Sequence, residues 1–241
     1  MTGTRGATTS VHQMMERAQA ALQRNHWFEA ERLSHRGLEM ARSSRDFMLM
    51  SRITLPLQEA RRQRLQQAFD VGSLRIVDES FGEEIRVETG CYLVQPPLVG
   101  ADARRLRLAA LEQEVPAAIL CREPVTKLKL CPIVAIGQVT IRTKVDPPTP
   151  WERPSLEWLA AALESLGDAA IETLDMRCDP IRLVDAILAR LDALPDHEKL
   201  HQALADACKA AATAIAEGRV PPEPPPVGDG DEEAAAATED E

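Results

Sequence analysis

The chain has 241 residues, of which 44% are hydrophobic, so it is long enough to bury a core of one or two domains. Its formal net charge is −10, but residues 221–241 hold eight acidic residues and no basic ones, which leaves a nearly neutral body. This near-neutral body and an aromatic content of only 3% argue against nucleic-acid binding, which needs basic surfaces and stacking platforms.

Residues 1–10 are polar, and no apolar run is long enough to cross a bilayer, so we expect neither a secretion signal nor a membrane span. The five cysteines are widely spaced and none forms Cys-x-x-Cys, a pattern typical of reduced, buried thiols. A zinc site made by Cys121 and Cys131 is an alternative, although their spacing is not that of a zinc knuckle. We therefore expect a cytoplasmic protein without a cofactor, and the sequence leaves its oligomeric state open.

Residues 11–70 are predicted to form a helical hairpin and a third helix, after a disordered segment over residues 1–10. Apolar residues recur every three or four positions from Val11 to Leu22, as on one face of a helix. A turn at Asn25 and His26 precedes a second helix over residues 27–42. Its small residues lie in one row and predict a close approach of two helix axes, with Trp27 covering the open end. These small residues are Ala30, Ser34 and Gly37.

The segment from Gln23 to Ala30, with Gly37-Leu-Glu39 downstream, resembles the turn and second helix of a tetratricopeptide repeat. Ala18 fits the small position of the first helix, but Arg42 stands where such a repeat usually has a closing proline. The resemblance covers about one repeat and no second copy follows, so another element must cap the unit. It implies a helical groove that binds a peptide or a helix of another protein.

The third helix is predicted over residues 46–69, with a kink or a break at Pro56, because proline removes a backbone donor there. Residues 1–70 hold 11 Arg and 7 acidic residues, a net charge of +4. We expect Arg61, Arg62 and Arg64, together with Trp27, to form an interaction surface for an acidic partner. The alternative is that these arginines lie on a solvated helix face.

Residues 71–146 are predicted to form a small mixed sheet with one covering helix. Short strands are indicated at residues 74–77, 85–87, 91–94 and 116–121, and a helix capped by Asp102 over residues 103–114. The strand–helix–strand order predicts a right-handed crossover between parallel strands. Residues 133–136 and 139–145, separated by Gly137 and Gln138, are predicted to form a hairpin.

A nucleotide site in this region is disfavoured, because the loop at residues 95–102 has one glycine, two prolines and no lysine with which to hold a phosphate. A small-ligand site at the strand ends is an alternative function. We expect it near Cys121-Arg-Glu-Pro124, which is polar and follows a buried strand.

A proline-rich linker at residues 147–154 and helices over residues 155–217 are predicted next, with helix stops or starts at Gly167, Asp168, Asp179 and Asp196. The segment His197-Glu-Lys-Leu-His201 matches His-Glu-x-x-His, the signature of zinc proteases. In a zinc hydrolase His197 and His201 would be the ligands and Glu198 the general base. The motif opens a helix and has no evident third ligand, so Glu198 also fits a first-turn anion.

Residues 218–241 are rich in Pro, Glu, Asp and Ala and are predicted to be disordered. The sequence thus predicts an α+β protein that is mostly helical. The favoured function is a non-enzymatic protein-interaction scaffold that binds a protein or peptide and neither nucleic acid nor membrane. A zinc hydrolase and a small-ligand-binding protein are the alternatives.

Overall fold

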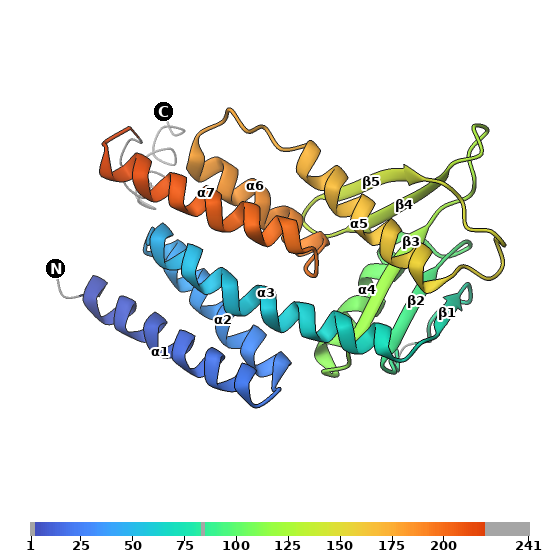
Figure 1. Ribbon diagram of the computed structural model, residues 1–241, viewed down its shortest axis with the longest axis horizontal. Helices are drawn as coiled ribbons and strands as arrows, with labels where there is room; N and C mark the ends of the chain where they lie inside the picture. The colour runs from blue at the N-terminus through green and yellow to red at the C-terminus, as the bar shows by residue number, and fades with distance from the viewer. Residues whose placement is uncertain (1–2, 83–84, 220–241) are drawn as a thin grey trace, which may run out of the picture.

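The structure is a computed structural model that describes residues 3–82 and 85–219. Within these residues the chain is α+β, as predicted, with one mixed five-stranded sheet and helices at both ends of the chain (Figure 1). The predicted disordered tail lies outside the described residues, apart from Gly218 and Arg219. No helix in the described part is both long and apolar enough to cross a membrane.

The predicted helical hairpin is present and consists of α1 (Gly3–Gln23) and α2 (Trp27–Ser43), joined by a turn at residues 24–26. Because α1 begins at Gly3, the prediction of a disordered segment over residues 1–10 is wrong for residues 3–10. Gly37 allows the close approach expected in this region, and its main neighbour is on the third helix: a Cβ there would overlap Ile53.

The third helix, α3 (Phe47–Asp70), runs through Pro56 without the break that the sequence allowed. Asp46 caps its start by accepting a hydrogen bond from the Leu49 backbone N–H at 2.9 Å. Pro56 is buried, and Thr54, two residues before it, donates to the Met50 carbonyl at 2.9 Å. One face of α3 packs on α2 and another on the last helix of the chain (Figure 1).

The sheet consists of β1 (Leu74–Val77), β2 (Gly90–Val94), β3 (Ala117–Arg122), β4 (Cys131–Ile136) and β5 (Thr140–Val145), in sequence order. The first three strands are parallel, and the last two continue the sheet in antiparallel pairing. The crossover from β2 to β3 is α4 (Gly100–Glu112), as the strand–helix–strand pattern predicted.

Residues 85–87 are not a strand, contrary to prediction. The side chain of Gln113 satisfies their backbone, since it accepts from the Val87 N–H at 3.1 Å and donates to the Ile85 carbonyl at 2.7 Å. Gln113 follows α4, so this segment is held by the crossover helix instead of by a neighbouring strand. The helix itself begins before the predicted cap, and Asp102 lies in its first turn and accepts from the Val99 N–H at 3.0 Å.

The predicted covering helix is α4, which packs on one face of the sheet, and the other face is covered as well. Alternate side chains of β2 and β3 point to opposite faces: Leu93 and Leu120 belong to the main core, whereas Tyr92 and Cys121 pack against α4. The main core joins the sheet to α1–α3 and to three C-terminal helices, α5 (Leu156–Glu172), α6 (Pro180–Ala193) and α7 (Glu198–Ala216).

The proline-rich segment 147–154 has no helix or strand, as expected of a linker, yet the elements on its two sides share this core. Asp179 caps α6 as predicted and accepts from the Ile181 N–H at 2.8 Å. Gly167 does not end a helix but lies inside α5. Only glycine fits at this position, because the His197 ring occupies the place where a Cβ would project. The start of α7 is one residue later than predicted, with His197 as the residue before its first turn.

Candidate functional site

The sheet is open between β3 and β4. These strands pair only at Cys121↔Val134 and Arg122↔Ile133, whereas β4 and β5 pair along their whole length. Glu123, just after β3, continues the pairing by donating its backbone N–H to the Pro132 carbonyl at 2.8 Å, but among the described residues the rest of β3, before Cys121, has no ladder partner on β4. Unpaired strand edges inside a sheet are uncommon, since backbone N–H and C=O groups away from water need partners.

The turn of the β4–β5 hairpin is held at α6. Gln138 donates its backbone N–H to Asp192 Oδ2 at 2.7 Å. Gly137 lies so close to α6 that a Cβ would be 2.5 Å from the Ala193 nitrogen. A side chain at residue 137 would therefore push the hairpin off α6.

A cavity of about 290 Å³ occupies the opening and lies near the lower end of the size range of small-molecule sites. Its walls come from α3, α4, α5, the two separated strands and the connection between α6 and α7. The apolar lining residues are Leu65, Phe69, Ala103, Ala117, Ala118, Ile119, Val134, Ala135, Ile136, Ala160, Leu163, Ala193, Leu194 and Pro195. The polar lining residues are Arg62, Arg104, Arg107, Cys121, Glu164, Asp196, His197 and Glu198.

The buried or clustered carboxylates of this lining already have cationic partners. Asp196 Oδ1 lies 3.2 Å from Arg64, and burial raises the pKa of this aspartate although nearby arginines oppose that effect. Glu164 Oε1 accepts from Lys199 Nζ at 2.6 Å. Glu198 is exposed, and Gln202 donates to it at 3.3 Å. The acidic side of the cavity therefore offers little unbalanced negative charge.

Two lining arginines, Arg104 and Arg107 on α4, have no carboxylate partner among the described residues. Arg107 makes one long hydrogen bond, to the Ile136 carbonyl at 3.4 Å, and Nε of Arg104 is buried without a partner. Burial lowers the pKa of Arg107, against the opposing effect of Asp196 and Asp192. The third lining arginine, Arg62, is paired with Glu59 at 2.8 Å.

The sequence analysis missed these two arginines, although the sequence holds a signal for them. They are three residues apart on one helix, and neither has an acidic residue three or four positions away. Arg105, between them, has Asp102 three positions before it, and the two pair at 3.7 Å. Only the fold shows that the face with Arg104 and Arg107 borders a cavity.

The predicted ligand region at Cys121–Pro124 borders the cavity only through Cys121. Burial raises the pKa of this thiol to about 12, so at neutral pH it is an uncharged lining group and not a nucleophile. Arg122 points elsewhere: it is buried, donates to Gln95, and stacks 3.7 Å from the centre of the Trp151 ring.

The two histidines of His197-Glu-Lys-Leu-His201 do not face one ion. The buried His201 ring has Nδ1 2.9 Å from the His197 carbonyl and Nε2 3.3 Å from Arg61. A guanidinium at Nε2 occupies the position where a zinc ion would have to lie. Burial, followed by the charge of Arg61, lowers the pKa of His201 to about 3.

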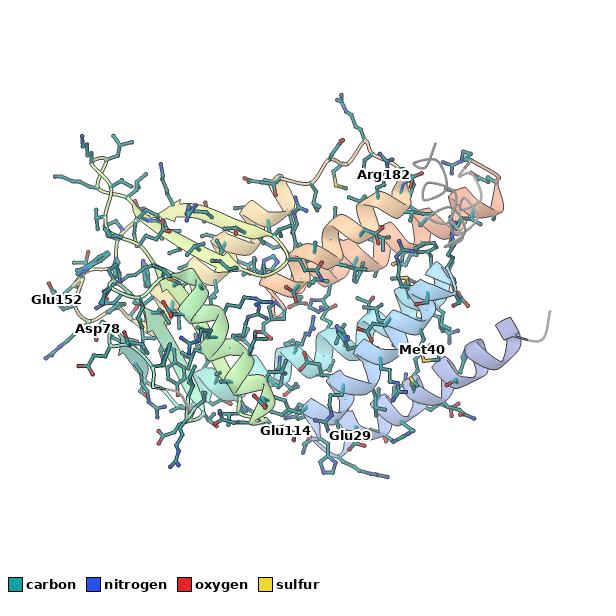
Figure 2. The ribbon with its side chains drawn as sticks, turned by 180° about the vertical axis from the view of Figure 1, so that it is seen from behind. Glu29, Met40, Asp78, Glu114, Glu152 and Arg182 are labelled. Carbon is teal, nitrogen blue, oxygen red and sulfur yellow. The ribbon has the colours of Figure 1, made fainter. Side chains whose placement is uncertain are left out.

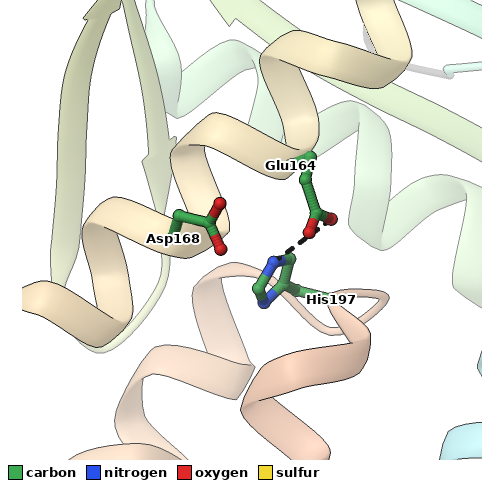
Figure 3. Close-up of side chains that lie close together, drawn as sticks. All are labelled: Glu164, Asp168 and His197. Carbon is green, nitrogen blue, oxygen red and sulfur yellow. Dashed lines mark ion pairs between the residues drawn. The ribbon is translucent and has the colours of Figure 1, made fainter.

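His197 instead faces α5, where it meets Glu164 and Asp168 (Figure 3). Its Nε2 lies 3.4 Å from Glu164, and neither ring nitrogen makes a hydrogen bond within the described chain. This trio is the one group of His, Cys and acidic residues in the described part whose atoms lie close enough to hold a metal, and Cys121 and Cys131 are not in it. Lys199 Nζ, 2.6 Å from Glu164 and 2.7 Å from Asp168, pairs with both carboxylates and offsets one of their two negative charges.

The expected basic surface is not exposed as predicted. The Arg61 side chain is 9% exposed and pairs with the buried Glu31 at 2.8 Å, and the Arg64 side chain lies 3.0 Å from the same glutamate. Trp27 is half-buried, and only Arg62 is largely open to solvent. Arg61 and Arg64 are therefore not on a solvated helix face, because their three ion pairs join α3 to α2 and to Asp196 just before α7.

The C-terminal end of α4 lies beside the first two helices. Figure 2 shows Glu114 close to Glu29, and Glu114 pairs with Arg32 of α2. The cavity lining also combines both halves of the chain, since it includes Phe69 of α3 and Leu194 after α6.

Comparison with known proteins gives no relative for this arrangement. No protein-family model, no curated protein and no solved structure matches the chain.

Proposed function

We propose that the protein binds a small, largely apolar molecule in the cavity between β3 and β4. The observation that carries this proposal is the opening of the sheet itself. Two strands that pair at one end are separated along the rest of their facing edges, and the space between them is lined by apolar side chains from α3, α4, α5 and the connection between α6 and α7.

Physical reasoning supports a bound molecule in this space. A closed sheet would bury the same alanine, valine and isoleucine side chains and would pair the free strand edges. The protein forgoes that stabilisation, while the β4–β5 turn packs closely on α6 through Gly137. A ligand that fills the cavity regains the apolar contacts and raises the stability of the folded chain.

The test is a thermal-shift screen of small apolar and amphipathic metabolites, followed by two matched variants. Ala160 lies exposed at the cavity rim, and Ala161 is its exposed neighbour on α5 outside the lining. We expect Ala160→Trp to obstruct the entrance and abolish the shift caused by any hit, and Ala161→Trp to leave it unchanged. Both variants place the same side chain on a solvent-facing helix position, so a general effect of tryptophan is controlled.

A ligand at one hundred times its dissociation constant stabilises the folded state by about 2.7 kcal/mol, which a thermal scan detects readily. A screen without any stabilising compound contradicts the proposal. So does a hit whose shift is as large in Ala160→Trp as in the wild type.

The hypothesis of a protein-interaction scaffold stays a prediction. It loses two of its four named residues, because Arg61 and Arg64 are held in ion pairs inside the protein. A zinc hydrolase based on His197 and His201 lacks support in the geometry, since the two rings have different partners.

A further inference from the structure

The charge around the cavity is unbalanced on one side. Arg104 and Arg107 line it from α4, and no carboxylate of the described residues pairs with either. They are one helical turn apart, so their side chains leave the same face of the helix. The cavity therefore combines apolar walls with two neighbouring guanidinium groups that have no carboxylate within ion-pair distance, although Asp196 and Asp192 act on Arg107 from farther away.

An unpaired, partly buried guanidinium is costly, because burial removes water without supplying a replacement acceptor. Neighbouring like charges add to that cost, and each of the two arginines lies in the electrostatic field of the other. Other arginines of this protein avoid the cost: Arg61 and Arg64 share Glu31, and Arg42 pairs with Asp185 at 2.7 Å. Arg122 has no carboxylate partner either, but it donates to Gln95 and to the Trp151 carbonyl, whereas Arg107 makes one long hydrogen bond and the buried Nε of Arg104 makes none.

We infer that the ligand of this cavity is an organic anion, with a carboxylate or phosphate head group held between Arg104 and Arg107 and an apolar body against β3 and β4. This inference rests on the proposed function and specifies the class of its ligand. Arginine suits both head groups, because its planar fork donates two parallel hydrogen bonds to adjacent oxygens. A cationic ligand fits less well, because Glu164 and Asp196 are already paired with Lys199 and Arg64, whereas the two arginines have no such partners.

The test compares probes that share one apolar body and differ in their head group. Octanoate, octyl phosphate and octanol are titrated into the full chain by calorimetry. We expect octanoate or octyl phosphate to bind at least about tenfold more tightly than octanol, since a hydrogen bond to a charged group contributes roughly 1.5–3 kcal/mol. The stronger of the two anionic probes identifies the head group.

The double variant Arg104→Gln/Arg107→Gln removes both charges and keeps hydrogen-bonding side chains of similar reach. It should weaken the anionic probe at least about tenfold, to the affinity of octanol, and leave octanol unchanged. Arg105→Gln is the matched control, because Arg105 lies between the two on α4, pairs with Asp102 and does not line the cavity. It should bind all three probes as the wild type does.

The outcomes separate the two proposals. Octanol binding that equals the anionic probes and is lost in Ala160→Trp keeps the cavity as a binding site and overturns the anionic class. Anion binding that survives Arg104→Gln/Arg107→Gln overturns it as well, and so does failure of both anionic probes to bind the wild type. If, in addition, no compound in the metabolite screen stabilises the protein, the proposed function fails with it.

Discussion

Two groups of arginines in this protein differ in how their charge is compensated. Arg61 and Arg64 are enclosed between α2, α3 and the start of α7, where Glu31 and Asp196 pair with them. Arg104 and Arg107 border the cavity of the opened sheet and have no such partners. The charges of the first group are balanced by carboxylates of the same chain. The second group has guanidinium N–H donors for which the chain supplies no carboxylate.

Arg61 and Arg64 hold the fold together, whereas Arg104 and Arg107 are available to a ligand. A buried ion pair that loses one member leaves the other charge without water or partner, so its removal is strongly destabilising. A charge that has no partner in the folded protein already carries its desolvation cost, so its removal should not destabilise. Removing the anion that pairs with Arg61 and Arg64 should therefore lower the free energy of unfolding, whereas removing the charges of Arg104 and Arg107 should not.

The largest expected effect is at Glu31. Glu31→Gln should lower the free energy of unfolding by about 3–5 kcal/mol, because Arg61 and Arg64 lose their shared anion while remaining buried. Urea denaturation followed by circular dichroism measures this change. Glu29→Gln is the control, since Glu29 lies on the same helix with a side chain 44% exposed, and its change should stay within about 0.5 kcal/mol. Equal effects of the two substitutions would mean that the network is not structural.

The second effect is a pH dependence centred on His201. Its pKa is lowered from 6.5 to about 3 in the folded protein, so between these values the unfolded state binds more protons and stability falls as pH falls. One such group contributes a slope of up to about 1.4 kcal/mol per pH unit. Burial also lowers the pKa of His197, which acts in the same direction, while the raised pKa of Asp196 acts in the opposite one.

Denaturation of the wild type and of His201→Gln at a series of pH values between 3 and 7 isolates this contribution. The variant should be less stable at pH 7 and should show a shallower dependence. An unchanged slope would show that His201 is not held neutral by Arg61 and its burial.

The smallest effect is expected at the cavity. Arg104→Gln/Arg107→Gln, measured without ligand, should leave the free energy of unfolding unchanged or raise it by up to about 1 kcal/mol, since an uncompensated desolvation cost is removed. The same denaturation assay applies, with Arg105→Gln as reference. A loss of several kcal/mol would place these arginines with Arg61 and Arg64 as structural groups and remove the contrast between the two regions.

Much of the secondary structure could be predicted because it depends on local pattern. The row of small residues in α2, the start of α6 at Asp179 and the β4–β5 hairpin are set by neighbouring residues, and the structure agrees with each. The errors occur where a distant residue decides. Gly167 was expected to end a helix, but it permits contact with His197, 30 positions away in the chain.

The candidate site could be predicted only in fragments. Cys121 was expected near a ligand and does border the cavity, but the partners of Arg61, Arg64 and His201 come from other elements and are not visible in local spacing. Two arginines on one face of a helix also do not predict a binding site until the fold shows which surface lies beside that face. Local reasoning therefore assigned the exposed role to the arginines that are buried.

The sequence by itself determined the α+β class, the order of most elements and the crossover between β2 and β3, because helix and strand periodicity and capping act over a few residues. The tertiary structure alone decided that the sheet opens between β3 and β4 and which arginines remain without an anion. Those features depend on how distant segments pack, as the β4–β5 turn does on α6, and on the charges that these segments bring together, and no local pattern encodes either.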